Sequence, residues 1–163
     1  MAGYTLIIPG EVVPKQSMRV RAVPYFNDNT RKCDAFIKTY QKKEVTDYEK
    51  KVEICCMEQL GVNFTPITGA IKMIITIVCE IPKSMTKTDQ AFIAQGGIIY
   101  KTTLPDLTDN LIKGICDGMQ GRAYVNDGQI CVIESQKIYG TDPRAIVTII
   151  PISEKLFQNP IFE

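Results

Sequence analysis

Alternating apolar and polar positions mark the extended segments of this chain. YTLII near the N-terminus has the composition of a strand, and Pro9-Gly10 ends it. A longer β-rich run follows in the middle of the chain, where every second residue from Ile71 to Cys79 is apolar and falls on one face. Two further β-rich segments near the C-terminus are separated by a turn containing Gly140 and Pro143. The four predicted strands cover residues 4–8, 70–81, 129–139 and 145–152.

Helical spacing of apolar residues predicts three helices. Thr46 to Glu49 has the Ser/Thr-x-x-Glu form of a capping box, which opens a helix, and Gly61 ends that helix. A short helix and a longer one follow, and the longer one leads into a short strand over residues 122–125. The three predicted helices cover residues 45–60, 84–95 and 107–120.

Residues 12–36 are basic and irregular. Two prolines and an Asn-Asp-Asn cluster within them are typical of a loop rather than of a helix or strand. The order of elements is then strand, loop, helix, strand, two helices and two strands. This order predicts an α+β fold, in which residues 1–163 form a single domain with a mixed β-sheet packed against helices.

Composition indicates an ordinary globular protein rather than a membrane or secreted one. The chain contains no apolar run near the ~20 residues that a membrane span needs. Its N-terminus lacks the basic-then-apolar layout of a secretion signal. Most of the six cysteines lie in apolar patterns, where reduced cysteines behave as small hydrophobic residues. We therefore expect a cytoplasmic protein without disulfides.

The chain has no histidine. This excludes nucleophile pairs of the Ser-His and Cys-His kind and zinc sites that contain histidine. Paired Cys-x-x-Cys spacing is also absent, which argues against a zinc site made of thiolates alone. Catalysis at neutral pH would therefore rest on carboxylates, lysine, tyrosine or a hard metal ion.

Charge is divided unevenly along the chain. Residues 12–43 contain eight Lys or Arg and two Asp, whereas the whole chain has a net charge of only +1. Such a basic segment suggests contact with a polyanion, although a solvated basic loop is the simpler alternative. Tyr25 and Phe26 within it could stack on bases or anchor the segment to the core. The residues predicted to bind DNA are Lys15, Arg19, Arg21, Arg31 and Lys32.

Residues 104–130 contain four aspartates, no glutamate and a single lysine. On a helix, Asp109, Lys113 and Asp117 fall within one quadrant, opposite an apolar face that would dock on the sheet. Asp106 stands just before this helix, and Asp127 follows it after a short turn. The sequence therefore places four carboxylates around one lysine.

Carboxylates gathered in this way repel one another unless a cation neutralises them. Hard oxygen ligands select Mg²⁺ or Mn²⁺, and a nearby lysine can stabilise charge on a phosphate, a combination that suits phosphodiester hydrolysis. Simpler roles remain open. Asp109 could open a helix, Asp109, Lys113 and Asp117 could form ion pairs within the helix, and Asp127-Gly128 could be a hairpin turn.

The stretch PDLTDNLIKGICDGMQGRAYVNDGQI, together with IIPGEVVPKQSMRVR near the N-terminus, resembles the RusA family of Holliday-junction resolvases. That family has an ordered set of acids, with Asn-Leu after the second, a lysine three residues after that Asn, and a final Asp-Gln-Ile/Val. In this sequence Gly128 stands between Asp127 and Gln129 of the final motif. Leu107 and Thr108 separate the first two acids, where the family commonly has one residue. Asn126 stands where the family often has a second acid.

The resemblance implies a RusA-like fold and an endodeoxyribonuclease that resolves four-way DNA junctions by paired symmetric nicks. It implies Asp106, Asp109 and Asp127 as ligands of Mg²⁺, for which Mn²⁺ can substitute. It also implies Lys113 as the essential lysine and Asp117 as a supporting acid. A homodimer is implied as well, acting on branched DNA and not on membranes, in the cytoplasm of a bacterial host and encoded by a phage or prophage.

Two other functions fit parts of the sequence. A non-catalytic DNA-binding accessory protein would keep the basic segment but would need no particular set of acids. A carboxylate-metal phosphoesterase acting on a small substrate would keep the acids but would not need the basic segment. Dependence of binding on salt distinguishes a polyanionic substrate from a small one.

Overall fold

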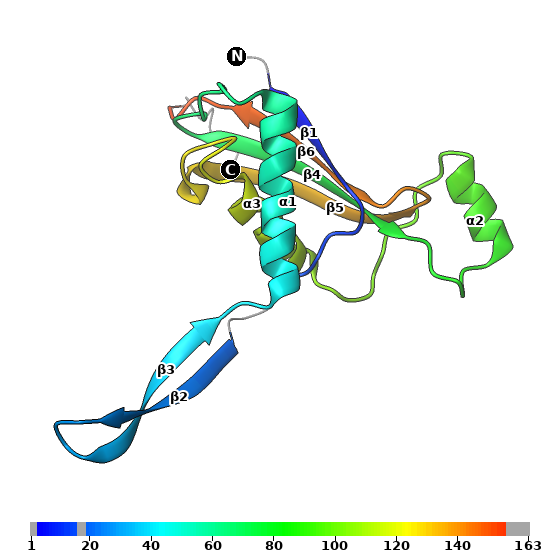
Figure 1. Ribbon diagram of the computed structural model, residues 1–163. Coiled ribbons are helices and arrows are strands. Elements are labelled where there is room, and N and C mark those ends of the chain that lie inside the picture. The colour runs from blue at the N-terminus through cyan, green and yellow to red at the C-terminus, as the bar shows by residue number, and fades with distance from the viewer. Residues whose placement is uncertain (1–2, 16–18, 156–163) are drawn as a thin grey trace, which may run out of the picture.

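The main sheet has four strands in the order β1-β6-β4-β5 (Figure 1). The computed structural model describes residues 3–15 and 19–155. Strand β6 is antiparallel to both of its neighbours, whereas β4 and β5 run parallel, so the sheet is mixed. The expected α+β class is therefore confirmed. The four strands are β1 (Tyr4–Pro9), β4 (Ile71–Glu80), β5 (Ile130–Gly140) and β6 (Arg144–Pro151).

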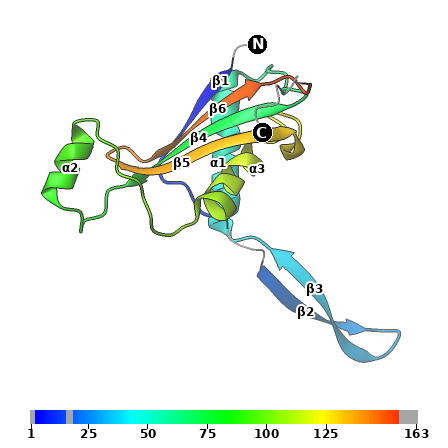
Figure 2. The same cartoon turned by 180° about the vertical axis from the view of Figure 1, so that it is seen from behind.

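Helices α1 (Lys43–Leu60) and α3 (Lys113–Met119) lie on one face of this sheet (Figure 1). In the view from behind, no helix of the described residues crosses the other face (Figure 2). The two helices approach closely at Gly118, where an added Cβ would lie 2.6 Å from Val52 Cβ. A larger residue there would push α3 away from α1. The core between helices and sheet is apolar and includes Val52, Ile75 and Ile115, each fully buried.

Helix α1 begins at Lys43, two residues before the predicted start. The capping box expected at Thr46 and Glu49 does not form. Thr46 lies inside the helix, where its hydroxyl donates to the carbonyl of Lys42. The predicted short helix is present as α2 (Lys87–Ala94), and its N-cap Thr86 accepts a hydrogen bond from the amide of Asp89.

The predicted helix over residues 107–120 has two parts. It opens as a π-helical segment, η1 (Leu107–Ile112), in which the amide of Leu111 donates to the carbonyl of Asp106. It then continues as α3. Single π-helical turns of this kind are frequent at functional sites. The strand predicted at residues 122–125 does not form, since Tyr124 makes isolated bridges only.

The basic segment predicted as a loop is a β-hairpin instead, and we call it the arm. It consists of β2 (Arg19–Asn27) and β3 (Lys32–Tyr40), paired antiparallel, and it projects away from the sheet and helices (Figure 1). The Asn-rich cluster forms its turn, where Asn27 Oδ1 accepts from the amides of Asn29 and Thr30. A proline within β2 is tolerated because both strands of a two-stranded ribbon are edge strands.

Within the described ranges, no helix is long and apolar enough to cross a membrane. The six cysteines are free, as expected. Cys55, Cys56 and Cys116 are buried among apolar side chains, which agrees with their reading as small hydrophobic residues.

Candidate active site

The acids singled out in the sequence lie along η1, α3 and the turn before β5. Asp106 directly precedes η1, and Asp109 lies in its first turn. Asp127 opens a single turn of 3-10 helix, η2 (Asp127–Gln129). All three carboxylates are exposed. The apolar face of η1 and α3 is buried in the core, so these elements present their polar side outward as the periodicity predicted.

These three carboxylates contribute few interactions to the fold. Within residues 3–15 and 19–155, Asp109 and Asp127 make no side-chain hydrogen bond or ion pair, and Asp106 accepts one long hydrogen bond of 3.5 Å from Asn110 Nδ2. The cap of η2 is Asn126 rather than Asp127, so the type I′ hairpin turn considered for Asp127-Gly128 is not formed. Three charges are therefore left facing solvent with no internal cation.

Lys113 begins α3 and is exposed. In the described part of the chain it has no carboxylate within 4.0 Å. The ion pairs that the sequence allowed between Lys113 and the acids four residues away are therefore absent. An exposed lysine without an internal ion pair is free to contact an anionic substrate.

Asp117 forms an ion pair with Lys15, a residue near the N-terminus. Lys15 Nζ donates to Asp117 Oδ2 and also to Glu49 Oε1, the latter at 2.8 Å. Burial lowers the pKa of Lys15, but hydrogen bonds and charges from Asp117 and Glu49 outweigh it and raise the pKa above its ordinary value. Lys15 thus holds its segment against α1 and α3, and its role in DNA binding stays a prediction.

Replacing Lys15 with Gln should lower the free energy of unfolding by about 1–3 kcal/mol, between the values for exposed and for buried pairs. The folded-state pKa of Lys15 is raised, so its contribution is complete at neutral pH and is lost as pH rises through that pKa. Urea denaturation at neutral and strongly alkaline pH measures both effects. Lys50→Gln, at an exposed lysine of α1, serves as the control. Equal stability of the two variants at neutral pH would contradict the structural role.

A network of hydrogen bonds fixes the turn that carries Asp127. Gln129 Nε2 donates to the carbonyls of Ile67 and Gly69 at 3.0 and 2.7 Å, and its Oε1 accepts from the amide of Asn126 at 2.8 Å. Asn126 Oδ1 accepts in turn from the amide of Gly128. Sequence reasoning did not assign a role to Gln129. The signal was present as an Asn-x-x-Gln capping box.

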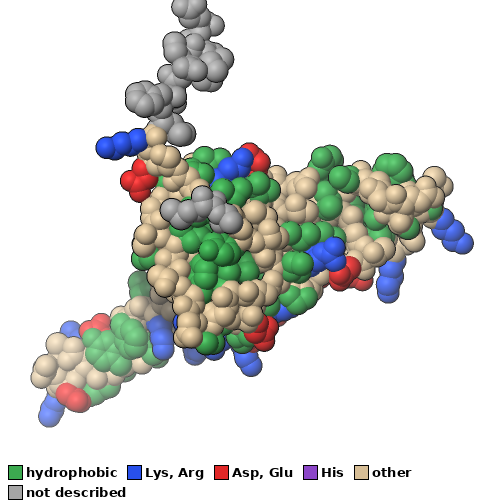
Figure 3. All heavy atoms as spheres, turned by 90° about the horizontal axis from the view of Figure 1, so that it is seen from above, with side chains coloured by type: hydrophobic (Ala, Val, Ile, Leu, Met, Phe, Trp, Pro, Cys, Tyr) green, Lys and Arg blue, Asp and Glu red, His purple; other side chains and the backbone are tan. Residues whose placement is uncertain are grey.

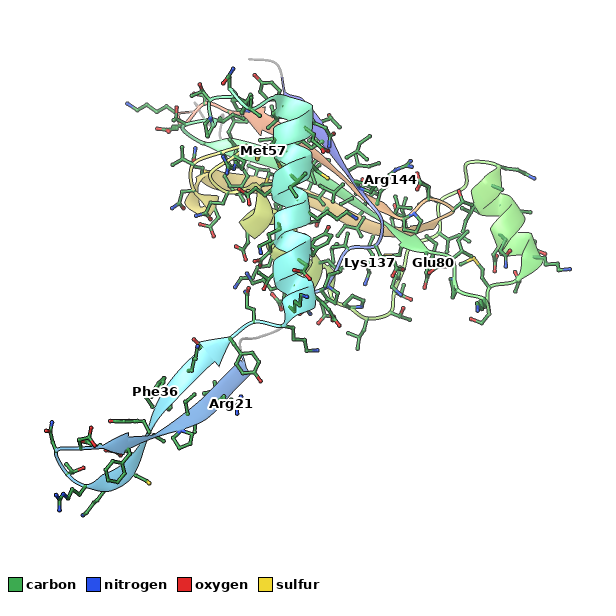
Figure 4. The ribbon with its side chains drawn as sticks, in the orientation of Figure 1. Arg21, Phe36, Met57, Glu80, Lys137 and Arg144 are labelled. Atoms are coloured by element: carbon green, nitrogen blue, oxygen red, sulfur yellow. The ribbon has the colours of Figure 1, made fainter. Side chains whose placement is uncertain are left out.

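A lysine from β5 fixes the segment before Asp106. Lys137 Nζ donates to the carbonyls of Thr103 and Pro105, both at 2.7 Å (Figure 4). No sequence signal linked Lys137 to this segment, because the residues are more than thirty positions apart. Lys137 therefore positions the backbone next to Asp106 without being free to contact substrate.

Asp117 and Asp127 act on the same buried pair, although they come from different elements. The Tyr124 hydroxyl donates to the carbonyl of Cys116 at 2.8 Å. Burial raises the pKa of the Cys116 thiol to about 11, although a hydrogen bond with Tyr124 opposes the shift, and the negative charges of Asp117 and Asp127 add to it. Burial also raises the pKa of Tyr124, with smaller contributions from the same two acids. The hydrogen bond from Tyr124 to Cys116 thus holds the segment before Asp127 against α3.

The donor chemistry fits a hard divalent cation, because exposed and unpaired carboxylate oxygens are the ligands that Mg²⁺ prefers. The described residues nevertheless contain no group of three or more Asp, Glu, Cys or His side chains close enough to hold one ion. Mg²⁺ usually takes one or two carboxylates and completes its shell with water and substrate phosphate. Asp106, Asp109 and Asp127 therefore stay predicted ligands.

The predicted DNA-binding residues occupy two places. Arg21, Arg31 and Lys32 are exposed on the arm, and no ion pair involves them in the part of the chain that the structure describes. Arg19 belongs to β2 by its backbone, but its side chain lies outside the described residues. Lys15 lies beside α3 and not on the arm.

Comparison with known proteins identifies the family. The family model described as "Endodeoxyribonuclease RusA" matches residues 9–150, which include the arm, the acids and Lys113. The chain belongs to this family. It is also 32% identical over 90 residues to the uncharacterized protein YqaN of Bacillus subtilis (strain 168). That match covers 55% of this chain and 63% of the relative, a little under two thirds of its length.

Proposed function

We propose that this protein is a Mg²⁺-dependent endodeoxyribonuclease that resolves four-way DNA junctions by paired symmetric nicks. Membership of the RusA family supports the reaction class. The observation that carries the proposal is that Asp106, Asp109 and Asp127, which flank Lys113 in the sequence, are exposed, and that none of them is neutralised by a cation within the described residues. These charges serve no internal ion pair in the described part of the chain, which leaves them available to a metal ion.

The residues divide the chemistry between them. Asp106, Asp109 and Asp127 would hold Mg²⁺, which supplies an activated water and neutralises charge on the phosphate. Lys113 places a cation beside the scissile phosphate and stabilises the charge that develops on its oxygens. Asp117 is paired with Lys15, so it acts as a supporting acid that fixes α3 rather than as a metal ligand. Gln129 and Lys137 position the backbone that carries Asp127 and Asp106.

The direct test uses a synthetic four-way junction and a duplex of matched sequence, each incubated with the purified protein in Mg²⁺ or in EDTA. We expect paired nicks in the junction with Mg²⁺, no nicks with EDTA, and little cleavage of the duplex. Cleavage of a small phosphodiester but not of DNA would favour the small-substrate phosphoesterase. Tight junction binding without cleavage in Mg²⁺ or Mn²⁺ would favour a non-catalytic accessory protein.

We further propose that the active form is a homodimer. A four-way junction has two equivalent strands to cut, and a two-fold symmetric protein supplies two equivalent sites. Sedimentation without DNA at micromolar concentration should give twice the chain mass of 18.3 kDa. A species of single-chain mass, both free and bound to the junction, would contradict the dimer.

A further inference from the structure

Strand pairing sorts the side chains of the arm onto two unlike faces. Residues directly opposite each other in an antiparallel pair point to the same face, and neighbours along a strand point to opposite faces. Arg21 pairs with Lys38, and Tyr25 pairs with Asp34. One face therefore carries both cations and rings, and we call it the basic-aromatic face. Its described residues along the two strands are Arg21, Val23, Tyr25, Asn27, Lys32, Asp34, Phe36, Lys38 and Tyr40.

The opposite face carries no charge. It is built from apolar and small side chains, and Phe26 is its largest member. We call it the neutral face. Both faces are open to solvent, since every residue of β3 is exposed. Figure 3 shows hydrophobic and basic side chains together on the arm. The neutral face consists of Val20, Ala22, Pro24, Phe26, Cys33, Ala35, Ile37 and Thr39.

The basic-aromatic face holds a repulsive pair. Arg21 and Lys38 stand directly opposite each other, and like charges in that position destabilise a sheet. Neither forms an ion pair within the described ranges. An isolated two-stranded hairpin is marginally stable even without such repulsion. A bound polyanion would remove the repulsion, so the charge pattern points to phosphates as the occupant.

Two aromatic rings lie beside these cations. Tyr25 from β2 and Phe36 from β3 have ring centroids 6.0 Å apart, and their side chains are 44% and 50% exposed. Arg21 and Phe36 both lie along the arm, away from the sheet and helices (Figure 4). Exposed rings next to a cationic strip are the arrangement that proteins use to stack nucleic-acid bases while contacting the backbone.

We propose that the basic-aromatic face of the arm binds unstacked bases of branched DNA, such as those exposed at a branch point or a bulge. Tyr25 and Phe36 stack on bases, and Arg21 and Lys38 contact the adjoining phosphates. Bases stacked within a duplex present no free ring face, so this surface favours DNA in which stacking is interrupted. The inference rests on the proposed function, which makes branched DNA the substrate, and it adds which part of that DNA the arm recognises and through which face.

The test compares two DNAs in EDTA: a duplex with a short thymine bulge and the same duplex without it. Fluorescence anisotropy gives both affinities, and their ratio measures preference for unpaired bases. Phe36→Ala should lower this ratio about ten-fold, because stacking of one base on one ring is lost. Phe36→Leu keeps apolar bulk in the strand and should lower it similarly. Arg21→Gln should weaken binding to both DNAs alike and reduce the salt dependence.

Phe26→Ala is the matched control, because Phe26 is 58% exposed but belongs to the neutral face. Its affinity ratio should equal that of the wild type. An unchanged ratio in both Phe36 variants, or an equal loss in Phe26→Ala, would overturn the assignment of faces. Mg²⁺-dependent nicking of a four-way junction by the wild type is measured in parallel. Its absence would count against the proposed function, whereas the affinity ratio still decides the role of the arm.

Discussion

Replacing Asp109 or Asp127 with Asn should lower junction nicking at least about a thousand-fold, because each is a proposed metal ligand and losing its charge would cost the transition state several kcal/mol. Asparagine keeps the size of the side chain. In the structure these carboxylates make no hydrogen bond or ion pair within the described residues, so the fold loses little. Junction binding in EDTA should persist or tighten, since negative charge facing the phosphates is removed.

The control for these variants is Asp47→Asn, at an exposed aspartate of α1 that likewise makes no ion pair in the described part of the chain. It should nick at the wild-type rate. Nicking and binding are measured on the same preparations, and circular dichroism checks that each variant is folded. Near wild-type nicking by both Asp109→Asn and Asp127→Asn would show that the carboxylates are not metal ligands.

Replacing Lys113 with Gln should lower the nicking rate of bound junction about a hundred-fold, the loss typical when one group that stabilises transition-state charge is removed. Because Lys113 has no internal ion pair within the described residues, its removal should change stability little. Single-turnover cleavage at saturating enzyme measures the chemical step apart from binding. The affinity for the junction should fall only modestly, since one phosphate contact among several is lost.

The matched control is Lys87→Gln, at an exposed lysine of α2. It removes the same charge from a helix that lies beside the main sheet and away from η1 and α3 (Figure 1). If the two lysine variants nicked bound junction at the same rate, Lys113 would have no special part in the chemistry. A loss in affinity alone for Lys113→Gln would make it a binding residue instead.

The arm is the element for which the local sequence pattern gave the wrong secondary structure. Prolines and asparagines in residues 12–36 predicted a loop, yet the same asparagines form the turn of a hairpin. The alternation of Arg21 with its apolar neighbours was a strand signal, but proline outweighed it in the prediction. Proline disfavours central strands far more than edge strands, and sequence alone does not say that both strands of this hairpin are edges.

Local interactions explain what could be predicted at the site. The apolar side chains of segment 107–120 share one face, and that face packs into the core. Asp109 and Lys113, on the opposite face, were therefore correctly expected to point outward. The π-helical start of this segment was not predicted. Its hydrogen bond between Leu111 and Asp106 spans one residue more than a regular helix allows, and no pattern of side-chain types marks that choice.

The sequence by itself determined the class of fold, the order of most helices and strands, and the exposed acids with their lysine, because each depends on neighbours within a few residues. The tertiary structure alone decided which of these charges are free. Lys15 reaches Asp117 across 102 positions, and Gln129 binds carbonyls about sixty positions away. Such contacts depend on which distant segments the fold brings together, and the periodicity of side chains along the sequence carries no information about that. The strand pairing of the arm, which places Phe36 and Phe26 on opposite faces, was likewise decided by the tertiary structure.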